Sequence, residues 1–133
     1  MILCGGASDD QVGNYKIEKR QKRINRNSWP SLCSFRDEHV FVIGGRRSKY
    51  DPNDLHHNSV ECYNLHADSW MLLPNLHKAR AGAGSCQFKD CVFVFCGVIE
   101  ARVRLNSIER LRVIKSDQNS IQVEQNWTLI QLD

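Results

Sequence analysis

The stretch Phe41-Val42-Ile43-Gly44-Gly45 decides the fold, because it joins a short apolar run to a pair of glycines. β-Branched and aromatic side chains suit a pleated strand that is packed on both faces. The two glycines allow a sharp turn or a positive φ where a Cβ atom would clash. We therefore interpret residues 39–45 as a buried strand that ends at a crowded position of the backbone.

The same unit occurs twice more in the chain. Residues 1–6 carry an apolar run that ends in two glycines, and residues 91–97 carry a longer run that ends in Cys96-Gly97. The sequence Asn58-Ser59-Val60-Glu61 returns 48 residues later as Asn106-Ser107-Ile108-Glu109. A period near 50 residues with four short strands in each unit predicts the blades of a β-propeller.

Other strands are predicted from alternating apolar and polar side chains between groups of turn residues. In residues 58–64, for example, Val60 and Cys62 alternate with Ser59 and Glu61. The polar segment 115–125 is expected to be a connection, and no long helical periodicity is present. The expected strands span residues 31–35, 58–64, 70–73, 81–88, 91–97, 106–111 and 126–130, with a weaker candidate at 14–18.

Several features of the middle of the chain occur together. They are Gly44-Gly45 at a strand end, Tyr63 followed by Trp70, the run Leu72-Leu73-Pro74, and Ala79-Arg80 before a Gly-Ala-Gly strand. This pattern resembles the kelch repeat family. The resemblance implies an all-β fold, a partial β-propeller made of kelch-type four-stranded antiparallel blades. It also implies that the motif residues serve the scaffold: Gly44, Gly45, Tyr63, Trp70 and Arg80.

The repeat predicts three parts: a degenerate partial blade at 1–30, a kelch blade at 31–76 and a second kelch blade at 77–133. The last part departs from the pattern, since Cys96-Gly97 replaces the glycine pair and Leu111 replaces the tyrosine. Propellers close with typically 4–8 blades. We therefore expect a fragment of a longer product or a degenerate copy, with open sheet edges that favour self-association.

Composition is ordinary for a soluble globular chain, with 41% hydrophobic residues, 25% charged residues and a net charge of +3. No apolar run reaches the roughly 20 residues of a membrane span, and residues 1–4 lack the basic start of a signal peptide. We expect a cytoplasmic protein with reduced cysteines. The cysteines in or beside apolar stretches are expected to be buried: Cys4, Cys62, Cys86, Cys91 and Cys96.

The basic stretch Lys16 to Arg26 could bind phosphate backbones or an import receptor, or it could be a solvated sheet edge. We favour the solvated edge, because the stretch lacks interleaved aromatic residues; a nucleic-acid partner is therefore not expected.

Catalytic motifs are absent from the sequence, which has no Gly-x-Ser-x-Gly, no phosphate-binding loop and no His-Glu-x-x-His. His56-His57 lies near Asp51 and Asp54 without coherent ligand spacing, so neither a metal site nor a cofactor is predicted. The chain is predicted not to be an enzyme. The alternatives are a fragment of a propeller enzyme whose active-site residues lie outside this chain, or a nonfunctional remnant.

Binding through loops is the predicted function. The resemblance implies a partner-binding face made of the loops between the second and third strands and the loops that enter the next blade, here 46–57, 98–105 and 75–80. Arginines can pair with carboxylates, and a tyrosine adds contact area. We predict a protein–protein interaction module that binds an acidic peptide segment of another protein; the arginines could instead only solubilise the loops. The candidate residues are Arg46, Arg47, Lys49, Tyr50, Arg102 and Arg104.

Overall fold

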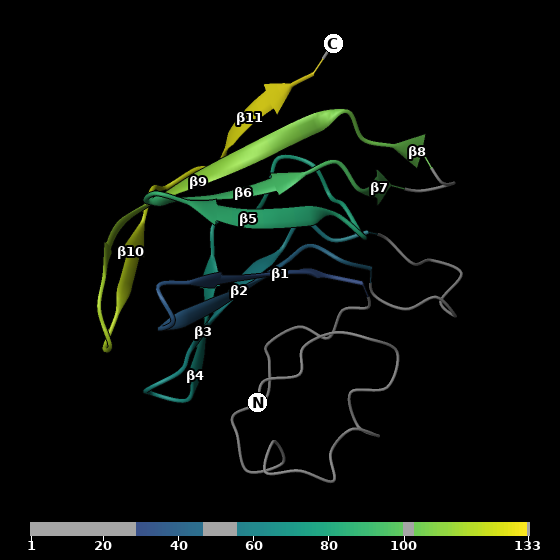
Figure 1. The fold of residues 1–133 in the computed structure, drawn as a ribbon. Helices are drawn as coiled ribbons and strands as arrows, with labels where there is room; N and C mark the ends of the chain where they lie inside the picture. Colours follow the sequence, from purple (N-terminus) through teal and green to yellow (C-terminus); the bar gives the residue numbers. More distant parts are fainter. Residues whose placement is uncertain (1–28, 47–55, 100–102, 133) are drawn as a thin grey trace, which may run out of the picture.

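The computed structural model describes residues 29–46, 56–99 and 103–132. These residues form antiparallel β-sheets and contain no helix (Figure 1). The all-β fold class is therefore confirmed, and the sheets are consistent with a partial kelch-type propeller. The basic stretch and the strand candidate at 14–18 lie outside the described residues, and the predicted division into three parts stays a prediction.

The first sheet, called blade 1 below, has the strand order β1-β2-β3-β4. Each strand follows the previous one through a turn or loop, as in a meander. All three pairings are antiparallel. The strands are β1 (Ser31–Phe35), β2 (His39–Ile43), β3 (Val60–Asn64) and β4 (Ser69–Leu73).

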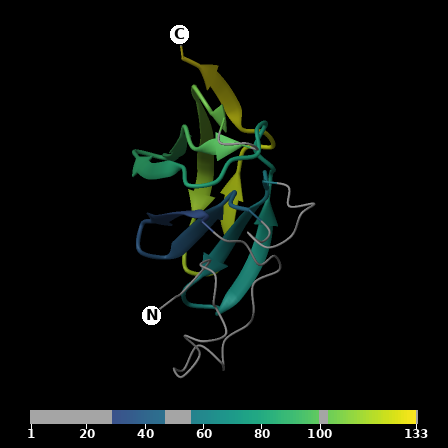
Figure 2. The ribbon, with the colours of Figure 1, turned by 90° about the vertical axis from the view of Figure 1, so that its right-hand side faces the viewer.

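The second sheet, called blade 2 below, has the order β10-β9-β6-β5, and β11 also pairs with β9. A separate two-stranded ribbon is formed by β7 (Val98–Ile99) and β8 (Val103–Arg104). Figure 2 shows blade 1 below blade 2. The blade 2 strands are β5 (Gly84–Phe88), β6 (Cys91–Phe95), β9 (Ser107–Ser116), β10 (Ile121–Val123) and β11 (Thr128–Gln131).

The two blades share one strand register. In blade 1, Phe41 pairs with Cys62, and Cys62 pairs with Met71. In blade 2, the residues 52, 48 and 57 positions later are Phe93, Arg110 and Thr128, and they pair in the same way. The spacings found in the sequence therefore correspond to equivalent positions of two sheets.

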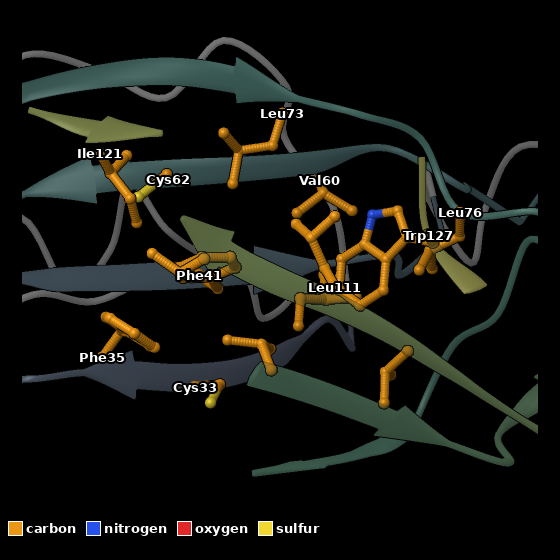
Figure 3. Packing of buried hydrophobic residues seen from close by; sticks show 14 residues of the cluster. Cys33, Phe35, Phe41, Val60, Cys62, Leu73, Leu76, Leu111, Ile121 and Trp127 are labelled. Carbon is orange, nitrogen blue, oxygen red and sulfur yellow. The ribbon is translucent and has the colours of Figure 1, made fainter. Parts of the chain in front are cut away.

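The hydrophobic core lies between the two blades (Figure 3). Apolar side chains of β1, β2 and β3 face those of β6 and β9, and Trp127 fills the space near the start of β11. The Trp127 indole N–H donates a hydrogen bond of 2.8 Å to the Pro74 carbonyl, so its polar atom is satisfied on burial. The core contains Cys33, Phe35, Phe41, Ile43, Val60, Cys62, Leu73, Leu76, Val92, Val94, Leu111, Val113, Ile121 and Trp127.

The sequence did not predict the hairpin formed by β9 and β10. The segment 115–125, expected to be a connection, contains the end of β9 and all of β10. The Asp117 carboxylate accepts hydrogen bonds from the backbone N–H groups of Asn119 (2.8 Å) and Ser120 (2.9 Å), which lower the pKa of Asp117 and fix the turn. Ile121 is buried in the core, and the Asn64 amide donates to the Gln118 carbonyl at 3.1 Å. The hairpin therefore packs onto blade 1.

His39, on β2, is a buried base with unused hydrogen-bonding capacity. It is 1% exposed, and neither ring nitrogen has a hydrogen-bond partner in the part of the chain that the structure describes. Burial lowers the pKa of His39, and the carboxylates of Glu38 and Asp117 offset part of this effect, while His66 adds to it. The folded state thus binds a proton at this ring less readily than the unfolded state does.

We expect the stability of the protein to fall as the pH drops below about 6.5, the ordinary pKa of histidine, because the unfolded state then gains the proton that the folded state resists. The measurement is the urea midpoint at pH 7.5 and at pH 5.5. In His39→Phe, the drop between these two values should become smaller. An unchanged drop would show that other groups cause the pH dependence.

Cysteine burial agrees with the sequence only in part. The five cysteines of the described residues are free thiols. Burial raises the pKa of the Cys62 thiol to about 12, and that of Cys33 to about 11 with a further contribution from Cys86. The prediction is wrong for Cys86 and Cys96, which are exposed, and Cys91 is only half-buried. Cys86 lies on the uncovered face of blade 2, and Cys96 lies beyond β6 with φ of 59°.

Candidate protein-interaction face

Residues 76–82, called the connector below, join the two blades and pass close to the loop that follows β2. The Leu76 N–H donates to the Asn58 carbonyl at 2.8 Å, and the Arg80 N–H donates to the His57 carbonyl at 3.1 Å. The Gly45 N–H in turn donates to the Arg80 carbonyl at 2.7 Å. Both ends of the β2–β3 loop are thus held by the backbone of the connector.

The connector also holds the loop that follows β6. Ala81 and Val98 exchange two backbone hydrogen bonds of 3.0 and 2.9 Å, and the Gly82 N–H donates to the Trp29 carbonyl at 3.0 Å. Three backbone segments that are far apart in the sequence therefore meet at one end of the two blades. The predicted binding loops belong to this end.

The glycine pair makes this close approach sterically feasible. Gly44 has φ of +65°, and a Cβ atom at this residue would lie 2.3 Å from the Arg80 carbonyl oxygen. Gly97, the equivalent residue of blade 2, has φ of +88°, and its Cβ would lie 2.9 Å from the Ala81 carbonyl oxygen. The expectation of a crowded strand end is therefore confirmed.

A buried ion pair anchors the connector on blade 2. The Arg80 Nη2 atom lies 2.8 Å from Glu109 Oε2, and both side chains have 0% exposure. Arg80 Nη1 donates to the carbonyls of Cys96 (2.8 Å) and Ser107 (3.0 Å), while Nη2 also donates to the Ser107 hydroxyl at 3.0 Å. The Arg80 guanidinium thus ties the connector to two segments of blade 2, as a scaffold residue does.

Glu109 accepts two further hydrogen bonds from the connector. The backbone N–H groups of His77 and Lys78 donate to its carboxylate at 2.6 and 3.1 Å. Its charge is therefore compensated by one arginine and two N–H groups, which a buried carboxylate requires. The sequence contained a signal for this site, since Glu61 and Glu109 are equivalent residues of the repeat. The role of Glu109 as the partner of Arg80 was not predicted.

Arg46 is the predicted binding residue whose surroundings the structure describes most fully. Its backbone forms an antiparallel bridge with His56 across the β2–β3 loop. Its guanidinium lies 5.4 Å from the centre of the Trp29 ring, a cation–π contact, and the Trp29 side chain is 53% exposed. No role in binding was predicted for Trp29, because it does not occupy the tryptophan position of the repeat.

Arg104 is exposed on β8, in the ribbon that follows the Ala81–Val98 bridge. The structure therefore brings the loops of Arg46 and Arg104 to the same end of the blades through the connector. Four other predicted residues lie outside the described residues: Arg47, Lys49, Tyr50 and Arg102. The role of all six residues in binding stays a prediction.

Metal chemistry finds no support in the described part of the chain. There, no group of three or more histidine, cysteine, aspartate or glutamate side chains is placed to hold a metal ion. His56 and His57 are described, whereas Asp51 and Asp54 are not. Residues 29–46, 56–99 and 103–132 also contain no helix that is long and apolar enough to cross a membrane.

Two comparisons with known proteins bear on the family. Residues 31–77 match the model of the Kelch motif. The chain is also 30% identical over 109 residues to the Kelch repeat and BTB domain-containing protein 2 of ectromelia virus (strain Moscow). This match covers 75% of the chain and 19% of the relative, so the chain spans about a fifth of the relative's length.

The motif match and the relative confirm the predicted resemblance to the kelch repeat family over part of the chain. Kelch repeats are generally protein-interaction modules, and proteins of this family typically have no enzymatic activity. The motif match coincides with blade 1 and the start of the connector. It therefore includes the glycine pair and the loop that follows β2.

Proposed function

We propose that this chain binds an acidic segment of another protein through the loops at the connector end of the blades. Arg46 and Arg104 contribute cationic groups from two loops, and Arg47, Lys49, Tyr50 and Arg102 belong to the same loops. An arginine can form two parallel hydrogen bonds with one carboxylate, which suits recognition of aspartate and glutamate side chains.

The observation that carries the proposal is the attachment of both loops to one connector. Gly45 and Val98, one from each loop, are hydrogen-bonded to adjacent residues of the connector, Arg80 and Ala81 respectively. The exposed Trp29 ring lies beneath the Arg46 guanidinium. Because backbone hydrogen bonds to the connector hold both loops, the loops lose less conformational entropy when a partner binds.

The test is the binding of a fluorescein-labelled dodecapeptide of alternating glutamate and glycine, measured by fluorescence anisotropy. The variant Arg46→Ala/Arg104→Ala should bind at least about tenfold more weakly, a loss of about 1.4 kcal/mol, because two charge-assisted contacts are removed. A matched control is Arg36→Ala/Lys89→Ala, which removes two cations from the turns at the opposite end of the strands.

Equal losses in the loop variant and the turn variant would show that the peptide responds to net charge alone. Retention of full affinity in the loop variant would exclude these arginines from the binding face. A peptide with glutamine in place of glutamate should bind to neither variant nor to the unmodified chain, since the proposal requires carboxylates.

A further inference from the structure

The strand β4 is the last strand of blade 1 and forms one edge of its sheet (Figure 1). It pairs with β3 along its whole length, and no strand of residues 29–46, 56–99 or 103–132 pairs with its other side. On an edge strand, every second residue directs its backbone N–H and C=O groups away from the sheet, where a further strand can pair with them. The edge of β4 therefore has the backbone geometry that strand addition requires.

The side chains of β4 leave this edge apolar. Met71 is 43% exposed and Leu72 is 55% exposed, and these consecutive side chains point to opposite faces of the sheet. The strand contains no charged residue, no proline and no glycine, and its register with β3 is regular. Charged residues, prolines and bulges are the features with which proteins keep a sheet edge from pairing with another chain. The strand β4 has none of these protections.

The other edges of the two blades are protected. The strand β1 packs against β5, and the Ser31 hydroxyl donates to the Ser85 hydroxyl at 2.6 Å. The pairing of β10 with β9 contains a register shift. Beside β11, the Lys78 ammonium donates to the Gln131 side chain at 3.1 Å, so a cation lies next to that strand. Among the described strands of the blades, β4 is therefore the one at which strand addition is least opposed.

A second copy of β4 fits this edge, because the strand is self-complementary about Met71. In an antiparallel pair with a two-fold axis at Met71, Trp70 faces Leu72 of the second copy. Ser69 then faces Leu73, so this register pairs all five residues of the strand. The exposed Met71 side chains of the two copies meet at the axis, and pairing removes their apolar surface from water. No like charges face each other, since β4 carries no charge.

We propose that two copies of this chain associate edge to edge through β4, so that their first blades form one continuous antiparallel sheet. The self-association expected from open sheet edges is thereby assigned to one strand. This contact goes beyond the proposed function, because it uses a strand edge and not the loops at the connector end. A pair of five-residue strands is smaller than a standard interface, which buries about 800 Å² on each partner. We therefore expect a weak dimer, with Kd on the order of 100 µM.

The test is sedimentation velocity of the unmodified chain at about 10 to 300 µM, where a dimer of this affinity forms progressively. A reducing buffer prevents disulfides between the exposed Cys86 and Cys96 of different copies. Met71→Lys should raise Kd at least about tenfold, because two like charges would meet directly opposite each other at the axis. The matched control is Thr128→Lys, which places the same charge at the equivalent residue of β11 and should leave the dimer unchanged.

An exchange of charges tests the two-fold axis directly. Met71→Glu alone should also be monomeric, whereas an equimolar mixture of Met71→Lys and Met71→Glu should associate, because opposite charges then meet at the axis. High salt should weaken this mixed dimer. If Met71→Lys does not fold, Leu72→Lys places the charge on the other face of the same edge and should weaken the dimer of the chain in the same way.

Hydrogen exchange tests whether the contact is a strand pairing. The backbone amides of residues 69–73 should exchange more slowly as the concentration of the unmodified chain rises, because the outward N–H groups become hydrogen-bonded. Association without slower exchange in these residues would overturn the pairing of β4 with β4.

Other outcomes would also contradict the proposal. A chain that stays monomeric at about 300 µM would overturn it, because a dimer of the expected affinity is then the main species. A dimer that Thr128→Lys disrupts and Met71→Lys does not would place the contact at β11. Equal weakening by both lysine variants would show that association responds to net charge alone. Two monomeric Met71 variants that do not associate when mixed would show that Met71 does not lie on a two-fold axis.

Discussion

Replacing Arg80 with methionine should lower the free energy of unfolding by about 3–5 kcal/mol, the cost of leaving a buried charge without its partner. Arg80 and Glu109 both have 0% exposure, and the arginine also donates to the carbonyls of Cys96 and Ser107. Methionine has a similar length but offers none of these donors. The Glu109 carboxylate would then keep only the backbone N–H groups of His77 and Lys78.

The measurement is urea denaturation at neutral pH, with Arg112→Met as the matched control. Arg112 also pairs with a carboxylate, but its side chain is 59% exposed and that of Asp90 is 44% exposed. Exposed ion pairs contribute about 0–1 kcal/mol, so the control should change stability little. A similar small loss in both variants would contradict the role of Arg80 as the anchor of the connector.

The strands of the two blades could be predicted from the sequence because their signals are local. Short runs of β-branched and aromatic residues between turn residues gave β1 (Ser31–Phe35), β2 (His39–Ile43) and β6 (Cys91–Phe95) within a few residues of their observed bounds. Equivalent residues of the repeat then fixed its period, near 50 residues. The alternation predicted for residues 58–64 is present, because Val60 and Cys62 belong to the core between the blades. However, β3 is buried on both faces, including Glu61 and Tyr63.

Long-range contacts explain what the sequence could not predict. The β9–β10 hairpin contains polar residues on a segment that reads as a connection, and it is held by contacts with blade 1, such as that of Asn64 with Gln118. Cys86 is exposed because no described element covers its face of blade 2. A residue's own neighbours in the chain carry no information about either fact.

The candidate site divides in the same way. The loop positions of Arg46 and Arg104 follow from the strand ends, and the sequence alone suffices to place them on neighbouring loops. The connector hydrogen bonds and the Trp29 ring beneath Arg46 require coordinates. Sequence reasoning thus found the loops, but it missed the groups that support them.

Gly44→Ala should lower the free energy of unfolding by about 3 kcal/mol, because two separate costs add. An alanine at φ of +65° is strained by about 1–2 kcal/mol. The added Cβ atom would also lie 2.3 Å from the Arg80 carbonyl oxygen, a backbone atom that has no rotamer to change. Relieving that contact requires a shift of the connector, at a cost typical of overpacking, about 1–3 kcal/mol.

Gly82→Ala separates the two costs. Gly82 has a similar φ of +62°, but nothing lies within 4 Å of the position of its Cβ atom. The Gly82→Ala variant should therefore lose about 1 kcal/mol of unfolding free energy. This loss is the backbone strain less a small gain from a less flexible unfolded chain. Urea denaturation of both variants measures the difference. Equal losses would mean that the connector moves freely past Gly44, and a connector so loosely held could not fix the loop of Arg46 for binding.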